Sequence, residues 1–158
     1  QRTLMAINAT GVTQFIRING DSPLFDGTLL SKLTELSQCC DLTTNLLQRS
    51  FPYGIAAEII SAEWFCEMGS SYELTEAEHV TKHLYRQIEK ARVGSVVCTH
   101  NYQTRRLTVD TENDYEYVRQ IFSSGHSVTD IHWWEVFGAK SCPRFVFSSP
   151  ESAEVFVD

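Results

Sequence analysis

Two aspartates follow short apolar segments and have the chemistry of a shared metal site. Asp21 stands in a Gly-Asp-Ser-Pro turn directly after Phe15–Ile18, and Asp110 closes the apolar segment Leu107–Asp110. Ligands of open α/β sheets bind at the carboxyl ends of the strands. Mg²⁺ is commonly held by one or two protein carboxylates, and substrate phosphates and water complete its octahedron. Asp21 and Asp110 are therefore candidate Mg²⁺ ligands, provided that the fold brings the two segments together.

Each aspartate also has a structural interpretation. Asp-Ser-Pro is a common turn in which the carboxylate bonds the backbone two residues on, and spacing alone favours this for Asp21. Asp110 precedes Thr111 and could simply reinforce the N-terminus of a helix. Asp114 fits the capping-box partner of Thr111 better than it fits a metal ligand.

Arg17 and Arg106 are the candidate catalytic cations. Each lies beside one of the two aspartate-bearing segments, in a chain whose net charge is −7. Ordinary salt bridging is the simplest account of both residues, and contact with a phosphate or carboxylate is the second.

Four sequence blocks occur in order along the chain. They read R-x-x-G-D-S-P-L-x-D, F-P-x-G-x-x-x-E, E-H-V-T and R-x-T-V-D-T-x-x-D, at Arg17–Asp26, Phe51–Glu58, Glu78–Thr81 and Arg106–Asp114. With these blocks, residues 3–122 resemble the C-terminal part of the cytidylyltransferases that activate acidic and related sugars. The resemblance is to the spore coat polysaccharide biosynthesis and acylneuraminate branches of that family.

The resemblance implies transfer of a cytidylyl group from CTP to a sugar hydroxyl, with release of pyrophosphate, for cell-surface polysaccharide biosynthesis. The sugar would be acidic, such as a nonulosonic acid, and Asp21 and Asp110 would hold Mg²⁺. The loop at Gly54 would wrap the sugar, Glu58 would accept its hydroxyls, and Glu78 and His79 would shape the sugar pocket.

These substrate-binding candidates have plainer interpretations too. Gly54 could be a loop glycine with positive φ, and Glu58 a strand-end carboxylate that faces water. His79 and His83 are spaced for one helical face, but the glutamate that a zinc-protease helix needs directly after the first histidine is missing. His83 is expected on the helix surface.

Members of this family begin with a strand and a glycine-rich, basic loop that grips the nucleotide, and this chain contains no such segment. We therefore expect a fold that is incomplete at its N-terminus. The alternative function is a catalytically incomplete α/β domain for interaction or scaffolding. A phosphatase-like phosphotransfer enzyme ranks last, because its D-x-D motif is absent.

Bulk composition bounds the class of protein. With 158 residues and 42% hydrophobic content the chain is long enough to bury a core, and the lack of a basic run argues against nucleic-acid binding. Five cysteines without a C-x-x-C pair indicate reduced thiols, and no apolar run reaches transmembrane length. The expected setting is cytoplasmic, with CTP and a sugar as partners, no membrane contact, and a homodimer as in the family.

Apolar periodicity predicts an α/β fold with a mostly parallel, Rossmann-like sheet and helices on both faces. We expect residues 1–124 to form the C-terminal part of a cytidylyltransferase-like domain, and residues 125–158 an aromatic-rich extension that covers a sheet edge or partner surface. The expected helices are 2–9, a helix after Asp26, 62–68, one opened by Thr75, and one opened by Thr111. The expected strands are 14–18, 41–47, 54–60, 93–99 and 107–110.

Overall fold

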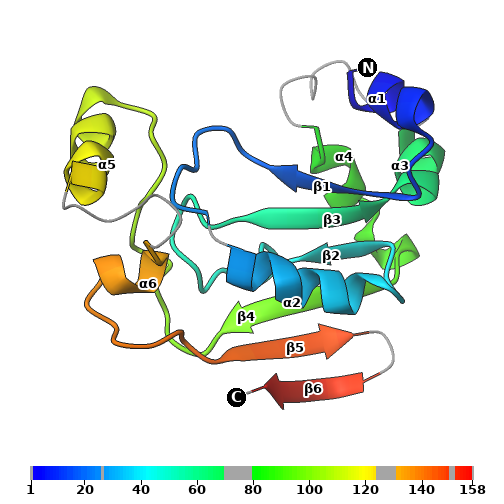
Figure 1. The fold of residues 1–158 in the computed structure, drawn as a ribbon. Helices are drawn as coiled ribbons and strands as arrows, with labels where there is room; N and C mark the ends of the chain where they lie inside the picture. Colours follow the sequence, from blue (N-terminus) through cyan, green and yellow to red (C-terminus); the bar gives the residue numbers. More distant parts are fainter. Residues whose placement is uncertain (1, 26, 70–79, 124–130, 150–151, 158) are drawn as a thin grey trace.

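The computed structural model describes residues 2–25, 27–69, 80–123, 131–149 and 152–157 (Figure 1). The helices are α1 (Arg2–Thr10), α2 (Gly27–Ser37), α3 (Ala62–Met68), α4 (Lys82–Tyr85), α5 (Glu112–Ser123), α6 (Trp133–Val136) and the 3-10 helix η3 (Ile88–Lys90). The strands are β1 (Gln14–Ile18), β2 (Leu42–Thr44), β3 (Ala57–Ser61), β4 (Val93–Cys98), β5 (Phe145–Ser149) and β6 (Ser152–Val157).

The described strands form one six-stranded sheet in the order β1-β3-β2-β4-β5-β6. The α/β fold class is confirmed, but the expected mostly parallel sheet is wrong, because the pairing of β2 with β4 is the parallel one among five. Parallel neighbours need a long crossover between them. The loop after β2 instead returns the chain without a helix, so β3 runs antiparallel between β1 and β2.

Three strands nevertheless point the same way. Since β3 is antiparallel to both β1 and β2, those two strands are co-directional, and β4 is parallel to β2. The carboxyl ends of β1, β2 and β4 therefore lie at one edge of the sheet, where α/β proteins collect their functional side chains. The site depends on this arrangement.

Helices cover both faces of the sheet, as expected (Figure 1). On β3, Ile59 joins the core that contains Leu29 and Leu33 of α2. The next residue, Ile60, joins a second core with Trp64 of α3 and Leu84 of α4. This alternation follows from the two-residue period of a strand that is buried on both sides.

The C-terminal segment belongs to the same sheet and core. β5 pairs with β4 along Ser95–Cys98, and Trp133 and Phe147 are buried in the core that contains α2. The edge of β4 is thus covered by residues of the predicted extension. The boundary expected at 124/125 falls outside the described residues, and the two-part division stays a prediction.

The predicted bounds of helices and strands agree with the structure where the apolar periodicity of the sequence is strong. The bounds of β1 and α3 match the expected ranges, and Gly11 ends α1 with a φ of 65°. β2 is shorter than the expected 41–47, because Asn45 leaves the ladder and bonds the loop instead. Thr75 lies outside the described residues, and so does the predicted start of its helix. The described residues after this start form the short helices α4 and η3.

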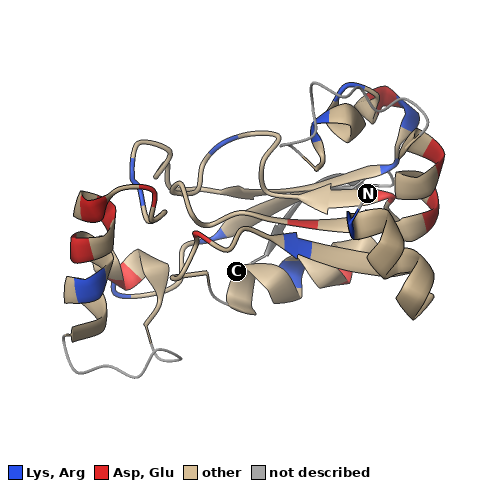
Figure 2. Cartoon of the chain, turned by 90° about the horizontal axis from the view of Figure 1, so that it is seen from above, with Lys and Arg blue, Asp and Glu red and all other residues tan. Residues whose placement is uncertain are grey.

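Charged side chains are dispersed over the fold. Figure 2 shows basic and acidic residues interspersed, without a continuous basic face in that view. A large nucleic-acid footprint would instead need Lys and Arg clustered on one face, and its absence stays a prediction.

The pairing of Asp41 with Arg92 is expected to make the stability of the fold depend on pH. The Asp41 carboxylate accepts hydrogen bonds from the backbone N–H of Arg92 at 2.9 Å and from its guanidinium at 2.8 and 3.2 Å, which ties the start of β2 to the start of β4. The guanidinium hydrogen bonds hold the pKa of Asp41 below its ordinary value, against the opposing effect of burial.

A carboxyl group with a depressed folded pKa stabilises the protein above its unfolded pKa of about 4 and loses that contribution as the pH falls through the folded value. We expect the free energy of unfolding to decline below about pH 4 more steeply in the wild type than in Asp41→Asn. Urea denaturation between pH 6 and pH 3 measures this difference. Equal pH slopes in the two proteins would show that this pair does not couple to folding.

Candidate functional site

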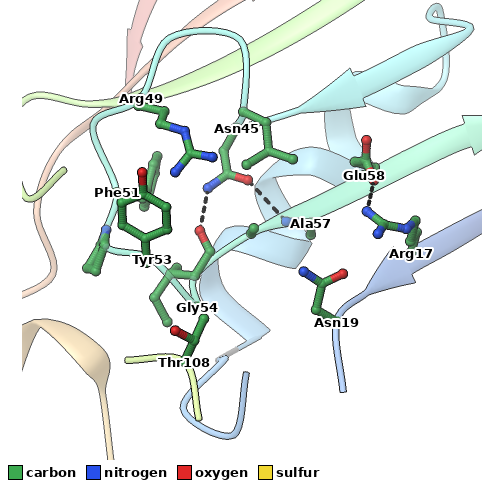
Figure 3. Close-up of a pocket in the computed structure, with 14 residues that line it drawn as sticks. Arg17, Asn19, Asn45, Arg49, Phe51, Tyr53, Gly54, Ala57, Glu58 and Thr108 are labelled. Atoms are coloured by element: carbon green, nitrogen blue, oxygen red, sulfur yellow. Dashed lines mark hydrogen bonds and ion pairs between the residues drawn. The ribbon is translucent and has the colours of Figure 1, made fainter. Parts of the chain in front are cut away.

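A cavity of about 150 Å³ lies at the edge where β1 and β2 end (Figure 3). It is bounded by the end of β1, by the loop between β2 and β3, and by the segment that follows β4. Its lining residues are Arg17, Asn19, Asn45, Leu46, Arg49, Phe51, Pro52, Tyr53, Gly54, Ile55, Ala56, Ala57, Glu58 and Thr108. Side chains from three distant parts of the sequence thus meet in one place.

Asn45 fixes the backbone of the loop that lines this cavity. Its amide nitrogen donates to the backbone carbonyl of Ile55 at 2.8 Å, and its oxygen accepts from the backbone N–H of Ala57 at 3.1 Å (Figure 3). The side chain is buried and uses both ends of its amide on backbone. Its role is to position the loop, because it has little hydrogen-bonding capacity left for a ligand.

Gly54 allows two backbone segments to touch. It has a φ of 97°, and a Cβ placed on it would lie 2.8 Å from the carbonyl carbon of Leu107. Tyr53 exchanges backbone hydrogen bonds with this segment, donating to Arg105 at 2.9 Å and accepting from Leu107 at 2.7 Å. The positive-φ interpretation is confirmed, and the close approach adds the reason why glycine is needed here.

The expected strand 107–110 is wrong. The segment forms an isolated parallel bridge between Tyr53 and Arg106 and is otherwise irregular. It pairs with the loop before β3 rather than with a strand of the sheet. An extended segment with alternating apolar residues can pair with a loop as well as with a strand. The sequence pattern alone therefore did not distinguish a strand of the sheet from this arrangement.

The segments that carry Asp21 and Asp110 lie side by side. The backbone N–H of Val109 donates to the backbone carbonyl of Asp21 at 2.9 Å. Ser22 donates to Oδ1 of Asp21 at 3.0 Å, and the Asp110 carboxylate forms an ion pair with Arg106. The described residues contain no group of three or more His, Cys, Asp or Glu that could hold a metal, so an ion shared here would have two protein carboxylates.

Asp114 acts as the helix cap that the sequence predicted. Its Oδ2 accepts from the backbone N–H of Thr111 at 2.9 Å, and its own N–H donates to the Thr111 hydroxyl at 3.2 Å. The hydrogen bond from the Thr111 side chain is the main cause that lowers the pKa of Asp114. Nε of Arg106 lies 3.4 Å from Oδ1 of Asp114, so Arg106 bridges Asp110 and the cap.

Glu58 is buried, not water-facing as its plainer interpretation expected. It is 1% exposed, because it shares with Ile60 the face of β3 that α3 and α4 cover. Nη1 of Arg17, its register partner on β1, lies 2.5 Å from Oε2 (Figure 3). The Thr81 hydroxyl donates to the same oxygen at 3.3 Å. Oε1 of Glu58 has no hydrogen-bond partner among the described residues.

The carboxylate of Glu58 also acts on a neighbouring phenol. Burial, followed by the negative charge of Glu58, raises the pKa of Tyr85 well above its ordinary value. The Tyr85 hydroxyl lies 3.2 Å from that of Thr44. Tyr85 therefore stays protonated at neutral pH and can serve only as a neutral hydrogen-bonding group.

The sequence and fold of this chain were compared with those of known proteins. No family model matches the chain. The chain is 26% identical over 136 residues to the spore coat polysaccharide biosynthesis protein SpsF of Bacillus subtilis (strain 168), covering 82% of this chain and 55% of that protein. A solved cytidylyltransferase from Leptospira borgpetersenii serovar Hardjo-bovis (strain JB197) superposes with a TM-score of 0.79 at 26% identity, covering 87% of this chain and 60% of that one.

The chain is related to the cytidylyltransferases. The suspected family relationship and the α/β nucleotidyltransferase-like fold are thereby confirmed. The chain spans between half and two thirds of the length of these two relatives. No helix in the described part of the chain is both long enough and apolar enough to cross a membrane.

In this cytidylyltransferase-related chain, the structure gathers most of the predicted site residues at one edge. Arg17, Gly54 and Glu58 line the cavity, while Asp21 and Asp110 lie on segments that supply Asn19 and Thr108 to it. Arg106 pairs with Asp110 rather than lining the cavity. Glu78 and His79 fall outside the described residues, so their assigned roles stay predictions.

His83, expected on the surface, is 2% exposed. Its ring centroid lies 5.6 Å from that of Phe65 in an edge-to-face contact. The expectation was wrong because α4 packs this side of its single turn against α3.

Sequence reasoning missed Arg49, a cation of the cavity. Its guanidinium lies 4.3 Å from the ring centroid of Tyr53, and it forms no ion pair with an acidic side chain among the described residues. A signal was available, because Arg49 stands two residues before the Phe51–Glu58 block in a segment that otherwise lacks charge.

Proposed function

We propose that this chain is the sugar-binding and metal-binding part of a cytidylyltransferase. The enzyme would transfer a cytidylyl group from CTP to a hydroxyl of an acidic sugar, such as a nonulosonic acid, and release pyrophosphate for cell-surface polysaccharide biosynthesis. One observation supports this most directly: the backbone hydrogen bond from Val109 to Asp21 holds both aspartate-bearing segments together beside the cavity. One relative is named for spore coat polysaccharide biosynthesis and the other as a cytidylyltransferase, and both names are compatible with this reaction.

Asp21 and Asp110 are the residues we propose to hold Mg²⁺. Both offer the hard carboxylate oxygens that this ion prefers, and their number suits a site that phosphates complete. When bound, the ion would offset negative charge on the α-phosphate and the leaving pyrophosphate. Arg106 orients the Asp110 carboxylate through its ion pair and adds positive charge at the same edge.

The cavity is suited to a polyhydroxylated ligand. Oε1 of Glu58 and Oγ1 of Thr108 are buried and have no partner among the described residues. A buried polar atom without a hydrogen bond costs about 1–3 kcal/mol, so ligand hydroxyls that bond these two oxygens would recover that cost. We propose that Gly54 keeps the loop close to the sugar and that Glu78 and His79 complete the pocket.

Arg49 supports an acidic sugar over a neutral one. Arg17 is already neutralised by Glu58, so Arg49 is the lining cation without an acidic partner among the described residues. A planar guanidinium that packs on Tyr53 is suited to bidentate contact with a carboxylate.

The proposal includes a cytoplasmic setting. None of the five cysteines forms a disulfide among the described residues. Thiols persist in reducing compartments, where CTP would also be available to the enzyme.

The test uses the intact protein with CTP, Mg²⁺ and matched panels of acidic and neutral sugars, and measures pyrophosphate. The proposal predicts release that needs CTP and an acidic sugar together. Calorimetric titration with CTP and Mg²⁺ supplies the second readout. Absence of both nucleotide binding and turnover would favour the scaffolding alternative instead.

Replacing Arg49 by methionine tests the substrate class. Loss of a hydrogen bond to a charged group costs about 1.5–3 kcal/mol, which corresponds to a roughly 10- to 100-fold increase in KM for the acidic sugar. The KM for CTP should not change. Arg119→Met is the matched control, because Arg119 pairs with Glu116 on the exposed face of α5. Equal effects on both substrates would contradict carboxylate recognition by Arg49.

A further inference from the structure

A pair of adjacent cysteines lies at the edge of the sheet opposite the cavity. Cys39 and Cys40 form the turn between α2 and β2, and their sulfurs are 3.9 Å apart. Cys39 is half-buried, whereas Cys40 is 5% exposed and lines an open polar cavity of about 500 Å³. The proposed cytidylyl transfer uses neither thiol.

The spacing of this pair does not suit a disulfide. Disulfide-bonded cysteines usually have Cα atoms about 4.4–6.8 Å apart, whereas adjacent residues are held at about 3.8 Å by a trans peptide. The backbone contains no cis peptide bond among the described residues. Direct oxidation of Cys39 with Cys40 would therefore strain the turn that starts β2.

A bridging ion suits the same spacing well. Bonds of about 2.3 Å from sulfur to a tetrahedral metal such as zinc place two thiolate sulfurs about 3.8 Å apart. The observed 3.9 Å separation is thus close to that of two sulfur ligands of one tetrahedral ion. Soft thiolate ligands select soft or borderline cations over Mg²⁺ and Ca²⁺.

The surroundings leave the two sulfurs as the protein ligands. Both oxygens of the neighbouring Asp41 carboxylate bond Arg92. No group of three or more His, Cys, Asp or Glu suited to a metal is present in the described ranges. Cys40 lines the open cavity, from which water or an external ligand would complete the coordination.

We infer that Cys39 and Cys40 form a two-sulfur binding site for one soft, thiolate-preferring divalent cation. The site is independent of the proposed function, since it lies at the other edge of the sheet and shares no residue with the cavity beside Asp21. On binding, each thiol gives up its proton to solvent, and two sulfur–metal bonds form without any redox step.

The experiment titrates reduced, metal-free protein with Cd²⁺ and follows the ultraviolet sulfur-to-cadmium charge-transfer absorption. We expect saturation at one equivalent in the wild type. Loss of a group that only supports a metal ligand typically costs about 10- to 100-fold in affinity. Cys39→Ser removes a direct ligand and should therefore weaken Cd²⁺ binding at least about 10-fold. Cys40→Ala should do the same, and Cys66→Ser, at an exposed thiol, should leave the titration unchanged.

Cys39→Ser is the decisive variant, because Cys39 is partly exposed and its replacement should leave the fold intact, as far-ultraviolet circular dichroism can verify. The Cys40 sulfur packs closely against Gly94, so Cys40→Ala serves as support. Unchanged affinity in Cys39→Ser, or loss of the absorption in Cys66→Ser, would overturn the inference.

Discussion

Replacing Asp21 or Asp110 by asparagine is expected to lower pyrophosphate release by about 100-fold or more. Asparagine keeps the size of the side chain but removes the negative charge that would hold the cation. Stabilisation of phosphoryl charge by a metal ion is worth several kcal/mol, and each 1.4 kcal/mol is tenfold in rate. Steady-state assays of the intact enzyme with CTP and its sugar measure the effect.

The control for this prediction is a carboxylate on α5, the helix that follows Asp110. Glu116 lies on α5 with 43% of its side chain exposed and pairs with Arg119, so Glu116→Gln should leave turnover unchanged. Raising the Mg²⁺ concentration should partly restore the Asp21 and Asp110 variants but not alter the control. Full turnover in either aspartate variant would remove that residue from the metal site.

Replacing Gly54 by alanine is expected to destabilise the protein by roughly 3 kcal/mol. A non-glycine residue at positive φ costs about 1 kcal/mol, and overlap of the new methyl with backbone costs about 1–3 kcal/mol. The overlapping atoms are the carbonyl carbon and oxygen of Leu107 and the nitrogen of Thr108, at 2.8–2.9 Å. Backbone cannot rotate away as a side chain would.

Gly11→Ala separates the two causes. Gly11 also has a positive φ, of 65°, but a Cβ there meets nothing within 4 Å. We expect this control to cost only about 1 kcal/mol in urea denaturation. Because Leu107 leads to Asp110, Gly54→Ala should also lower activity in the fraction that stays folded. Equal destabilisation by the two substitutions would show that the contact with Leu107 is not needed.

The sequence predicted the elements that local physics determines. The apolar stripe of α2, the capping box at Thr111 and the helical stop at Gly11 each depend on neighbours a few residues apart. Their signals survive in a single sequence because helix periodicity and capping are local. Three of the four sequence blocks, those beginning at Arg17, Phe51 and Arg106, lie on segments that the structure brings together.

Strand order and burial could not be predicted in the same way. One of the two interpretations of Glu58 had it face water, yet the antiparallel insertion of β3 between β1 and β2 places it beside Arg17, where it is buried. That insertion depends on long-range pairing, which residue spacing does not encode. Arg49 was missed for a similar reason, since its role depends on the loop fold that Asn45 imposes.

The most direct test of the account replaces Mg²⁺ by Mn²⁺ in crystals of the intact protein with CTP and locates the ion by its anomalous scattering. The account predicts one ion within about 2.3 Å of a carboxylate oxygen from each of Asp21 and Asp110, with phosphate oxygens completing its shell. An ion that contacts only one of these aspartates, or neither, would contradict the shared metal site on which the proposed reaction depends.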